Sequence, residues 1–121
     1  MKSKLILVVM LMFLGIFSSR AQGFQRRTVE ERTKMAIDRL VDSVKISDVQ
    51  QKDITAVFTD YYKAQDKIRE GLAPGARPER ADMEKIMLER DTKLKIILTE
   101  DQYNRFKEME SAMRNRSQRP Q

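Results

Sequence analysis

The pentapeptides ISDVQ at residues 46–50 and LTEDQ at residues 98–102 repeat one pattern: an apolar residue, a hydroxyl residue, an acid, a variable residue and a glutamine. A Ser or Thr at a helix N-cap accepts a hydrogen bond from the backbone N–H three residues later, and a Gln at that position bonds back to the N–H of the cap. The repeat therefore predicts two helix starts, each fixed by a capping box. The residues of this predicted helix-capping motif are Ile46, Ser47, Gln50, Leu98, Thr99 and Gln102.

Apolar residues at three- and four-residue spacing predict four helices around these starts, and no strand. The first three predicted segments are residues 28–44, 48–70 and 78–97, and the fourth begins at the second pentapeptide and ends near Met113. The predicted fold class is therefore all-α.

Residues 71–78 contain two glycines and two prolines, which interrupt the helical pattern. Pro78 is predicted as the first residue of the third helix, where its missing N–H is not needed. The second and third helices then form a long antiparallel hairpin. A continuous coiled coil is disfavoured because the same break interrupts its heptads. We expect dimerisation to complete the core, since a small domain without cysteine buries a limited share of its surface.

Residues 1–21 have the features of a secretory signal peptide. Lys2 and Lys4 precede an apolar run over residues 5–17, and Ser19-Arg20-Ala21 offers a cleavage site. The run is shorter than the roughly 20 apolar residues that span a bilayer, so the mature protein is predicted to have no stable membrane span. The remaining divisions are a flexible basic linker at 22–27, a helical domain at 28–113 and a disordered basic tail at 114–121.

The net charge of +6 is concentrated at the ends of the chain. Residues 30–110 hold all eighteen acids and sixteen of the Lys and Arg residues, so the helical body is close to neutral. Interspersed charges of this kind are typical of solvated helix faces, while the basic ends suit flexible arms near an anionic surface. The balance predicts no nucleic-acid partner.

The chain contains neither His nor Cys. This removes the usual nucleophile–base pairs, thiolate nucleophiles and zinc sites with nitrogen or sulfur ligands. Acidic pairs such as Asp48 with Asp53 lack the spacing of a calcium loop, and no Gly-rich phosphate loop is present. We therefore predict no enzymatic activity, no catalytic residue, no cofactor and no metal site.

The second pentapeptide, with Leu98, Thr99 and Gln102, resembles the LTxxQ motif of the Spy/CpxP family of periplasmic refolding chaperones and stress proteins. The first copy has Ile46 and Ser47 in place of Leu and Thr and keeps Gln50. The resemblance spans residues 28–113. It implies a helical hairpin that dimerises into a shallow cradle, a periplasmic location, and loose binding of unfolded or misfolded proteins without ATP.

Methionine and aromatic side chains form a large part of the predicted apolar surface, and Met adapts well to partners of different shape. Lys and Arg beside them would attract unfolded chains at long range. The candidate client-binding face, chosen from spacing alone, consists of Lys63, Lys67, Arg69, Arg80, Met83, Met87 and Arg90.

Two other functions fit the same scaffold. The protein is alternatively a regulatory accessory of an envelope stress-response system, in which it binds a membrane sensor kinase and is displaced by misfolded protein. In the other alternative, the basic ends hold it at an anionic surface.

Overall fold

The computed structural model describes residues 27–120 of the chain. This part consists of four helices, α2 (Val29–Ser43), α3 (Asp48–Glu70), α4 (Arg80–Ile97) and α5 (Glu100–Ser117), and its described residues contain no strand. The predicted all-α fold is therefore confirmed. The predicted signal segment, and the predicted linker apart from Arg27, lie outside the described residues.

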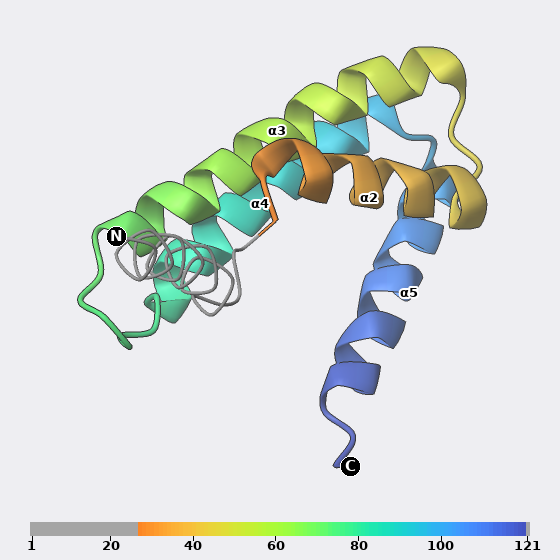
Figure 1. Ribbon diagram of the computed structural model, residues 1–121. Helices are drawn as coiled ribbons and strands as arrows, with labels where there is room; N and C mark the ends of the chain where they lie inside the picture. The colour runs from red at the N-terminus through yellow and green to blue at the C-terminus, as the bar shows by residue number, and fades with distance from the viewer. Residues whose placement is uncertain (1–26, 121) are drawn as a thin grey trace, which may run out of the picture.

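The longest helix, α3, lies at the centre of the arrangement. α4 lies beside α3 and runs in the opposite direction, while α2 packs along another side of α3 (Figure 1). α5 contacts both α2 and α4, and its last turns extend away from the other helices (Figure 1). Two short elbows reverse the chain: residues 44–47 join α2 to α3, and residues 98–99 join α4 to α5.

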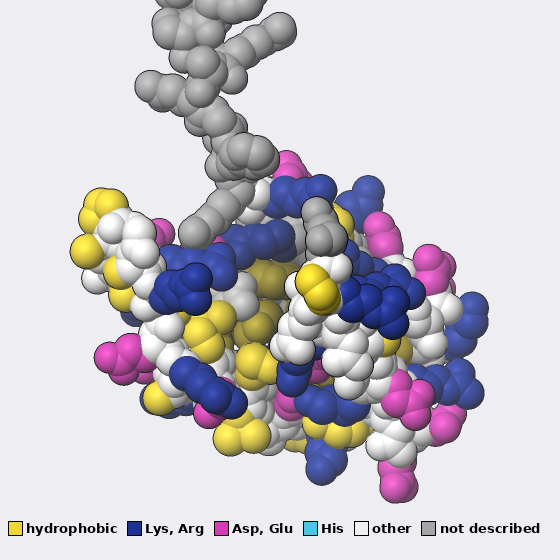
Figure 2. Space-filling model, turned by 90° about the horizontal axis from the view of Figure 1, so that it is seen from below, with side chains coloured by type: hydrophobic (Ala, Val, Ile, Leu, Met, Phe, Trp, Pro, Cys, Tyr) yellow, Lys and Arg dark blue, Asp and Glu magenta, His cyan; other side chains and the backbone are white. Residues whose placement is uncertain are grey.

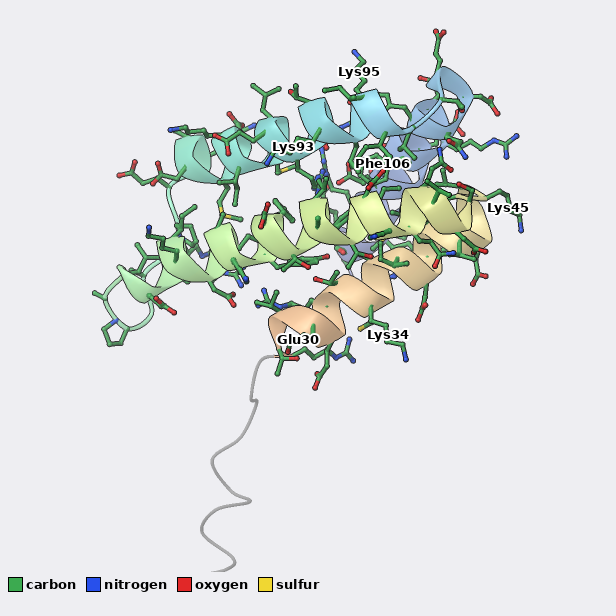
Figure 3. All side chains as sticks on the ribbon, turned by 90° about the horizontal axis from the view of Figure 1, so that it is seen from above. Glu30, Lys34, Lys45, Lys93, Lys95 and Phe106 are labelled. Carbon is green, nitrogen blue, oxygen red and sulfur yellow. The ribbon has the colours of Figure 1, made fainter. Side chains whose placement is uncertain are left out.

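The core lies where the four helices meet. Each helix contributes a fully or almost fully buried side chain: Leu40 from α2, Ile54 from α3, Leu94 from α4 and Phe106 from α5. The ring of Phe106 meets that of Phe58 edge to face, with centroids 6.3 Å apart. Figure 3 shows Phe106 reaching into the space between α3 and α4. Phe106 is therefore one of the side chains that attach α5 to the other helices.

The structure corrects the predicted start of the third helix. α4 begins at Arg80, and its N-cap is Glu79, whose backbone is extended at φ −63° and ψ 138°. Pro78 therefore lies outside the helix rather than at its first position. Proline fixes its own φ but imposes no helical ψ on the next residue, so it does not force the helix to start there.

The C-terminal end of α5 is also longer than predicted. The chain was expected to be disordered from residue 114, but α5 continues to Ser117. No Gly or Pro occurs between Met113 and Ser117, and the last turn carries Arg114 and Arg116. Arginine has a good helix propensity, and cations favour the negative end of the helix dipole.

Within residues 27–120, no helix is both long and apolar enough to cross a membrane.

Candidate functional site

Both predicted capping boxes form, at the starts of α3 and α5. The Ser47 hydroxyl accepts from the backbone N–H of Gln50, and the Gln50 side chain accepts in return from the N–H of Ser47 at 2.9 Å. Thr99 and Gln102 repeat this arrangement, with a return bond of 3.1 Å. The predicted capping role of these four residues is confirmed.

The two capping glutamines also bind each other, although they lie far apart in sequence. Gln50 Nε2 donates to Gln102 Oε1 at 2.7 Å, and Gln102 Nε2 donates to Gln50 Oε1 at 3.1 Å. Each amide also donates a second bond, at 3.2 Å, to a backbone carbonyl: Gln50 to Ile97 at the end of α4, and Gln102 to Lys45 in the first elbow. Both amides therefore use their two donor hydrogens and accept two bonds at the oxygen.

The two elbows are arranged in the same way about the Gln50–Gln102 pair, so that the bonds follow a local twofold pattern. Lys45 and Ile97, which accept the outer bonds, each lie two residues before an N-cap. Lys45 has a left-handed backbone with φ 62°, a conformation that is unfavourable for a residue with a side chain. Val44 and Ile46 on either side of it are buried, so the chain must reverse within a very short distance. The bond from Gln102 helps to hold the Lys45 carbonyl in that conformation.

The second ordered cluster of polar groups is centred on Arg90 of α4, which is only 6% exposed. Its guanidinium donates to both carboxylate oxygens of Glu110, at 2.8 and 3.1 Å, and to Asp91 at 2.9 Å. The same group lies 4.6 Å from the ring centroid of Tyr61 and 5.3 Å from that of Phe106. Arg90 therefore joins α3, α4 and α5 through both charge and cation–π contacts.

This burial corrects the prediction that Arg90 lies on an exposed client-binding face. Along α4, Arg90 shares the inward stripe of Met83, Met87, Leu94 and Ile97, each three or four residues from the next. Its charge is tolerated inside because two carboxylates and several aromatic rings replace water around it.

The other predicted binding residues differ in their exposure, and no single cleft gathers them. Lys63, Lys67 and Arg80 are exposed, whereas Met83 and Met87 are half-buried. Arg69 lines a separate cleft of about 520 Å³ between the start of α2 and the turn after α3.

A groove between α2 and α5 instead brings basic and methionine side chains together. An outer hollow of about 400 Å³ continues into a smaller one of about 80 Å³, whose floor includes Phe58 and Tyr62 of α3. On the face shown in Figure 2, hydrophobic side chains lie in a hollow and Lys and Arg side chains surround it. We call the outer hollow the α2–α5 groove; it is lined by Arg39, Ser43, Met109, Ala112, Met113 and Arg116.

Sequence reasoning missed Arg39 and Arg116 as partners in one site. Arg39 lies seven residues after Arg32 on α2, and Arg116 lies seven after Met109 on α5, so each pair shares a helix face. The sequence shows these spacings, but it does not show that α2 lies close to α5. No salt bridge involves Arg39 or Arg116 within the described part of the chain.

Within residues 27–120, no group of three or more acidic side chains is placed to hold a metal ion. No protein-family model, curated protein or solved structure matches this chain. The likeness to the Spy/CpxP family stays a prediction from the two pentapeptides.

Three titratable groups near Arg90, namely Tyr61, Tyr62 and Lys107, are expected to make the folded state less stable at high pH. Burial raises the pKa of Tyr61 and of Tyr62 above 10.0. Burial opposes the charge on Lys107, but the hydrogen bond and charge of Asp91 outweigh it and raise the pKa of Lys107 above 10.5. All three groups hold their protons more tightly in the folded state. Their contribution is therefore complete below pH 10 and declines as the pH rises through the folded-state values.

We expect the free energy of unfolding, measured by urea titration, to fall as the pH is raised above about 10. Replacing Tyr61 and Tyr62 together by Phe should make the fall shallower, because two of the three groups no longer titrate. An equally steep fall in the double variant would contradict this assignment.

Proposed function

We propose that this protein is a periplasmic, ATP-independent chaperone-like protein of the Spy/CpxP type that binds unfolded or misfolded envelope proteins. We place the client in the α2–α5 groove. The observation that carries the proposal is the combination there of two methionines, Met109 and Met113, with two arginines, Arg39 and Arg116, that form no salt bridge within the described residues.

The chemistry of the groove favours extended segments that are both acidic and apolar. Arg39 and Arg116 lie on opposite helices, so an acidic segment between them would be attracted from both sides. Met113 is 37% exposed, and methionine packs against side chains of many shapes. Contacts of this kind are dispersed and shallow, so a bound client would keep much of its conformational freedom.

The proposal is tested by aggregation of a chemically denatured client of acidic pI, diluted into buffer with increasing amounts of the mature protein. We expect suppression of light scattering near a stoichiometric ratio, and weaker suppression at high salt because the charge attraction is screened. Combining Met113→Ser with Arg39→Gln should raise the ratio needed for half suppression by roughly threefold or more.

The matched control combines Val49→Ser with Lys52→Gln. Val49 is 77% exposed, and both residues lie on α3 outside the groove. The control should suppress aggregation as well as the unaltered protein does. If the groove variant suppresses aggregation as well as the control does, the client does not bind in the α2–α5 groove. If the unaltered protein suppresses aggregation at no ratio, the chaperone function is rejected. Copurification of one defined membrane partner, with weak general client binding, would favour the regulatory alternative.

A further inference from the structure

The α2–α5 groove continues into a smaller hollow to which the proposed function assigns no role. We call this the inner hollow; its volume is about 80 Å³, against about 400 Å³ for the groove, and Arg39, Met109 and Met113 line both. Most of its other lining side chains are apolar or aromatic: Ala36, Leu40, Phe58, Tyr62 and Phe106. A space of this size holds several water molecules, so it can admit part of one side chain.

The two other charged residues that line the inner hollow neutralise each other. Both carboxylate oxygens of Glu110 accept hydrogen bonds from the Arg90 guanidinium, at 2.8 and 3.1 Å. A further charged group that entered the hollow would lose its hydration and would find both of these charges already paired. The inner hollow is therefore suited to an uncharged, apolar group.

The lining favours an aromatic group over an aliphatic one. The ring centroids of Phe58 and Tyr62 lie 6.0 Å apart, and Phe58 meets Phe106 edge to face. A further ring can add edge-to-face or offset contacts to such a cluster, and these contribute beyond the buried area alone. The thioethers of Met109 and Met113 also pack favourably against ring edges. An aromatic side chain should therefore bind here more tightly than a leucine.

A positive charge lies where the groove and the inner hollow meet. Arg39 lines both spaces, and it forms no salt bridge within residues 27–120. Arg116, which also forms none there, lines the groove alone. A carboxylate would thus find a partner at the opening of the inner hollow but not inside it.

We propose that the inner hollow is an anchor site for one aromatic side chain of the client, and that Arg39 binds an acidic side chain two residues away from it. This assignment rests on the proposed function. In an extended segment, side chains two residues apart point to the same side and lie about 7 Å apart. The ring can therefore enter the inner hollow while the carboxylate reaches Arg39. The preferred clients are unfolded chains with an aromatic residue and an acid at this spacing.

Short labelled peptides test this specificity. The probe is a fluorescein-labelled Gly/Ser peptide with one Phe at its centre and an Asp two residues away on each side. In fluorescence anisotropy at low salt, replacing the Phe by Leu should weaken binding by about threefold, and replacing it by Ala by about tenfold. Moving both Asp residues to the ends of the peptide keeps its net charge but should weaken binding by about threefold, because neither acid then reaches Arg39.

Variants of the protein test the role of Arg39. In Arg39→Gln, the probe and the peptide with displaced acids should bind equally. Arg116→Gln should weaken the binding of both peptides but keep the difference between them. Lys52→Gln is the matched control, because Lys52 lies on α3 and lines neither the groove nor the inner hollow. It should bind both peptides as the unaltered protein does.

The methionine methyl groups report where the ring binds. Met109 and Met113 line the inner hollow, whereas Met35 on α2 does not. In NMR spectra of the protein with isotope-labelled methionine methyl groups, the Phe probe should shift the resonances of Met109 and Met113 and leave that of Met35 in place. The Leu peptide should shift them less, because only an aromatic ring produces a ring-current shift.

Three results would overturn the anchor site: equal affinity for the Phe, Leu and Ala peptides, a preference for the nearby acids that persists in Arg39→Gln, or unchanged resonances of Met109 and Met113 in a bound complex. The absence of any peptide binding would also overturn it. The aggregation assay separates these failures from a failure of the proposed function. Suppression of aggregation without a peptide preference would keep the chaperone function and remove the anchor site, and the reverse result would keep the site and reject the function.

Discussion

Replacing Gln102 by Ala is expected to lower the free energy of unfolding by about 2–4 kcal/mol, although the side chain is only half-buried. The change removes the return bond of the capping box, both bonds to Gln50, and the bond to the Lys45 carbonyl. It also leaves Lys45 in a left-handed conformation without the bond that holds it. Urea denaturation followed by circular dichroism measures the loss.

The mutual bonding of the two glutamines makes a double-mutant cycle informative. Gln50→Ala should cost nearly as much as Gln102→Ala, but the double variant should cost clearly less than the sum, because the second substitution removes groups whose partner is already gone. Gln51→Ala is the matched control. Gln51 lies beside Gln50 on the same helix turn, and its side chain makes only a long 3.4 Å bond to Asp48. Strict additivity, or an equal effect at Gln51, would show that the glutamines act only as separate caps.

Arg90→Ala is expected to be the most destabilising single substitution on α4, at about 3–5 kcal/mol. The carboxylates of Glu110 and Asp91, which are only 18% and 13% exposed, then keep only Lys107 as a cation, at 3.6 and 2.9 Å. It also removes the guanidinium from the faces of Tyr61 and Phe106. Arg90→Lys should restore only part of the loss, because an ammonium group cannot reproduce the planar contacts with the rings.

Two further variants separate the effect of charge from that of packing at this site. In Arg90→Met combined with Glu110→Met, the unpaired carboxylate is gone and the apolar volume is kept, so the double variant should be more stable than Arg90→Ala. Arg80→Ala removes an exposed ion pair with Glu84 on the same helix and should change the free energy of unfolding by less than about 0.5 kcal/mol. Thermal and urea unfolding of Arg90→Ala, Arg90→Lys, the double Met variant and Arg80→Ala would measure these differences in stability. An Arg90→Ala protein as stable as Arg80→Ala would show that the buried cluster contributes nothing.

The sequence predicted the helices well where capping residues were explicit. Ser47 with Gln50 and Thr99 with Gln102 form local hydrogen bonds, so their meaning does not depend on the rest of the fold. Pro78 and Arg114 were misjudged because single-residue preferences at helix ends are weak compared with the surrounding backbone and helix dipole.

The candidate site was harder to predict because it depends on contacts between helices. Spacing groups Arg90 with Met83 and Met87 on one face of α4, but spacing alone does not show whether that face is exposed or buried. The Gln50–Gln102 pair and the approach of Arg39 to Arg116 join segments that are distant in sequence, and neither composition nor periodicity defines such pairs.

The Gln50–Gln102 pair has a consequence for the order in which the chain folds. Because each amide completes the bonding of the opposite elbow, neither turn reaches its final stability until both have been synthesised. A polypeptide emerging from its N-terminal end would present the first turn well before its counterpart exists. We therefore expect the helices to pack in one cooperative step, only after the second turn has been synthesised.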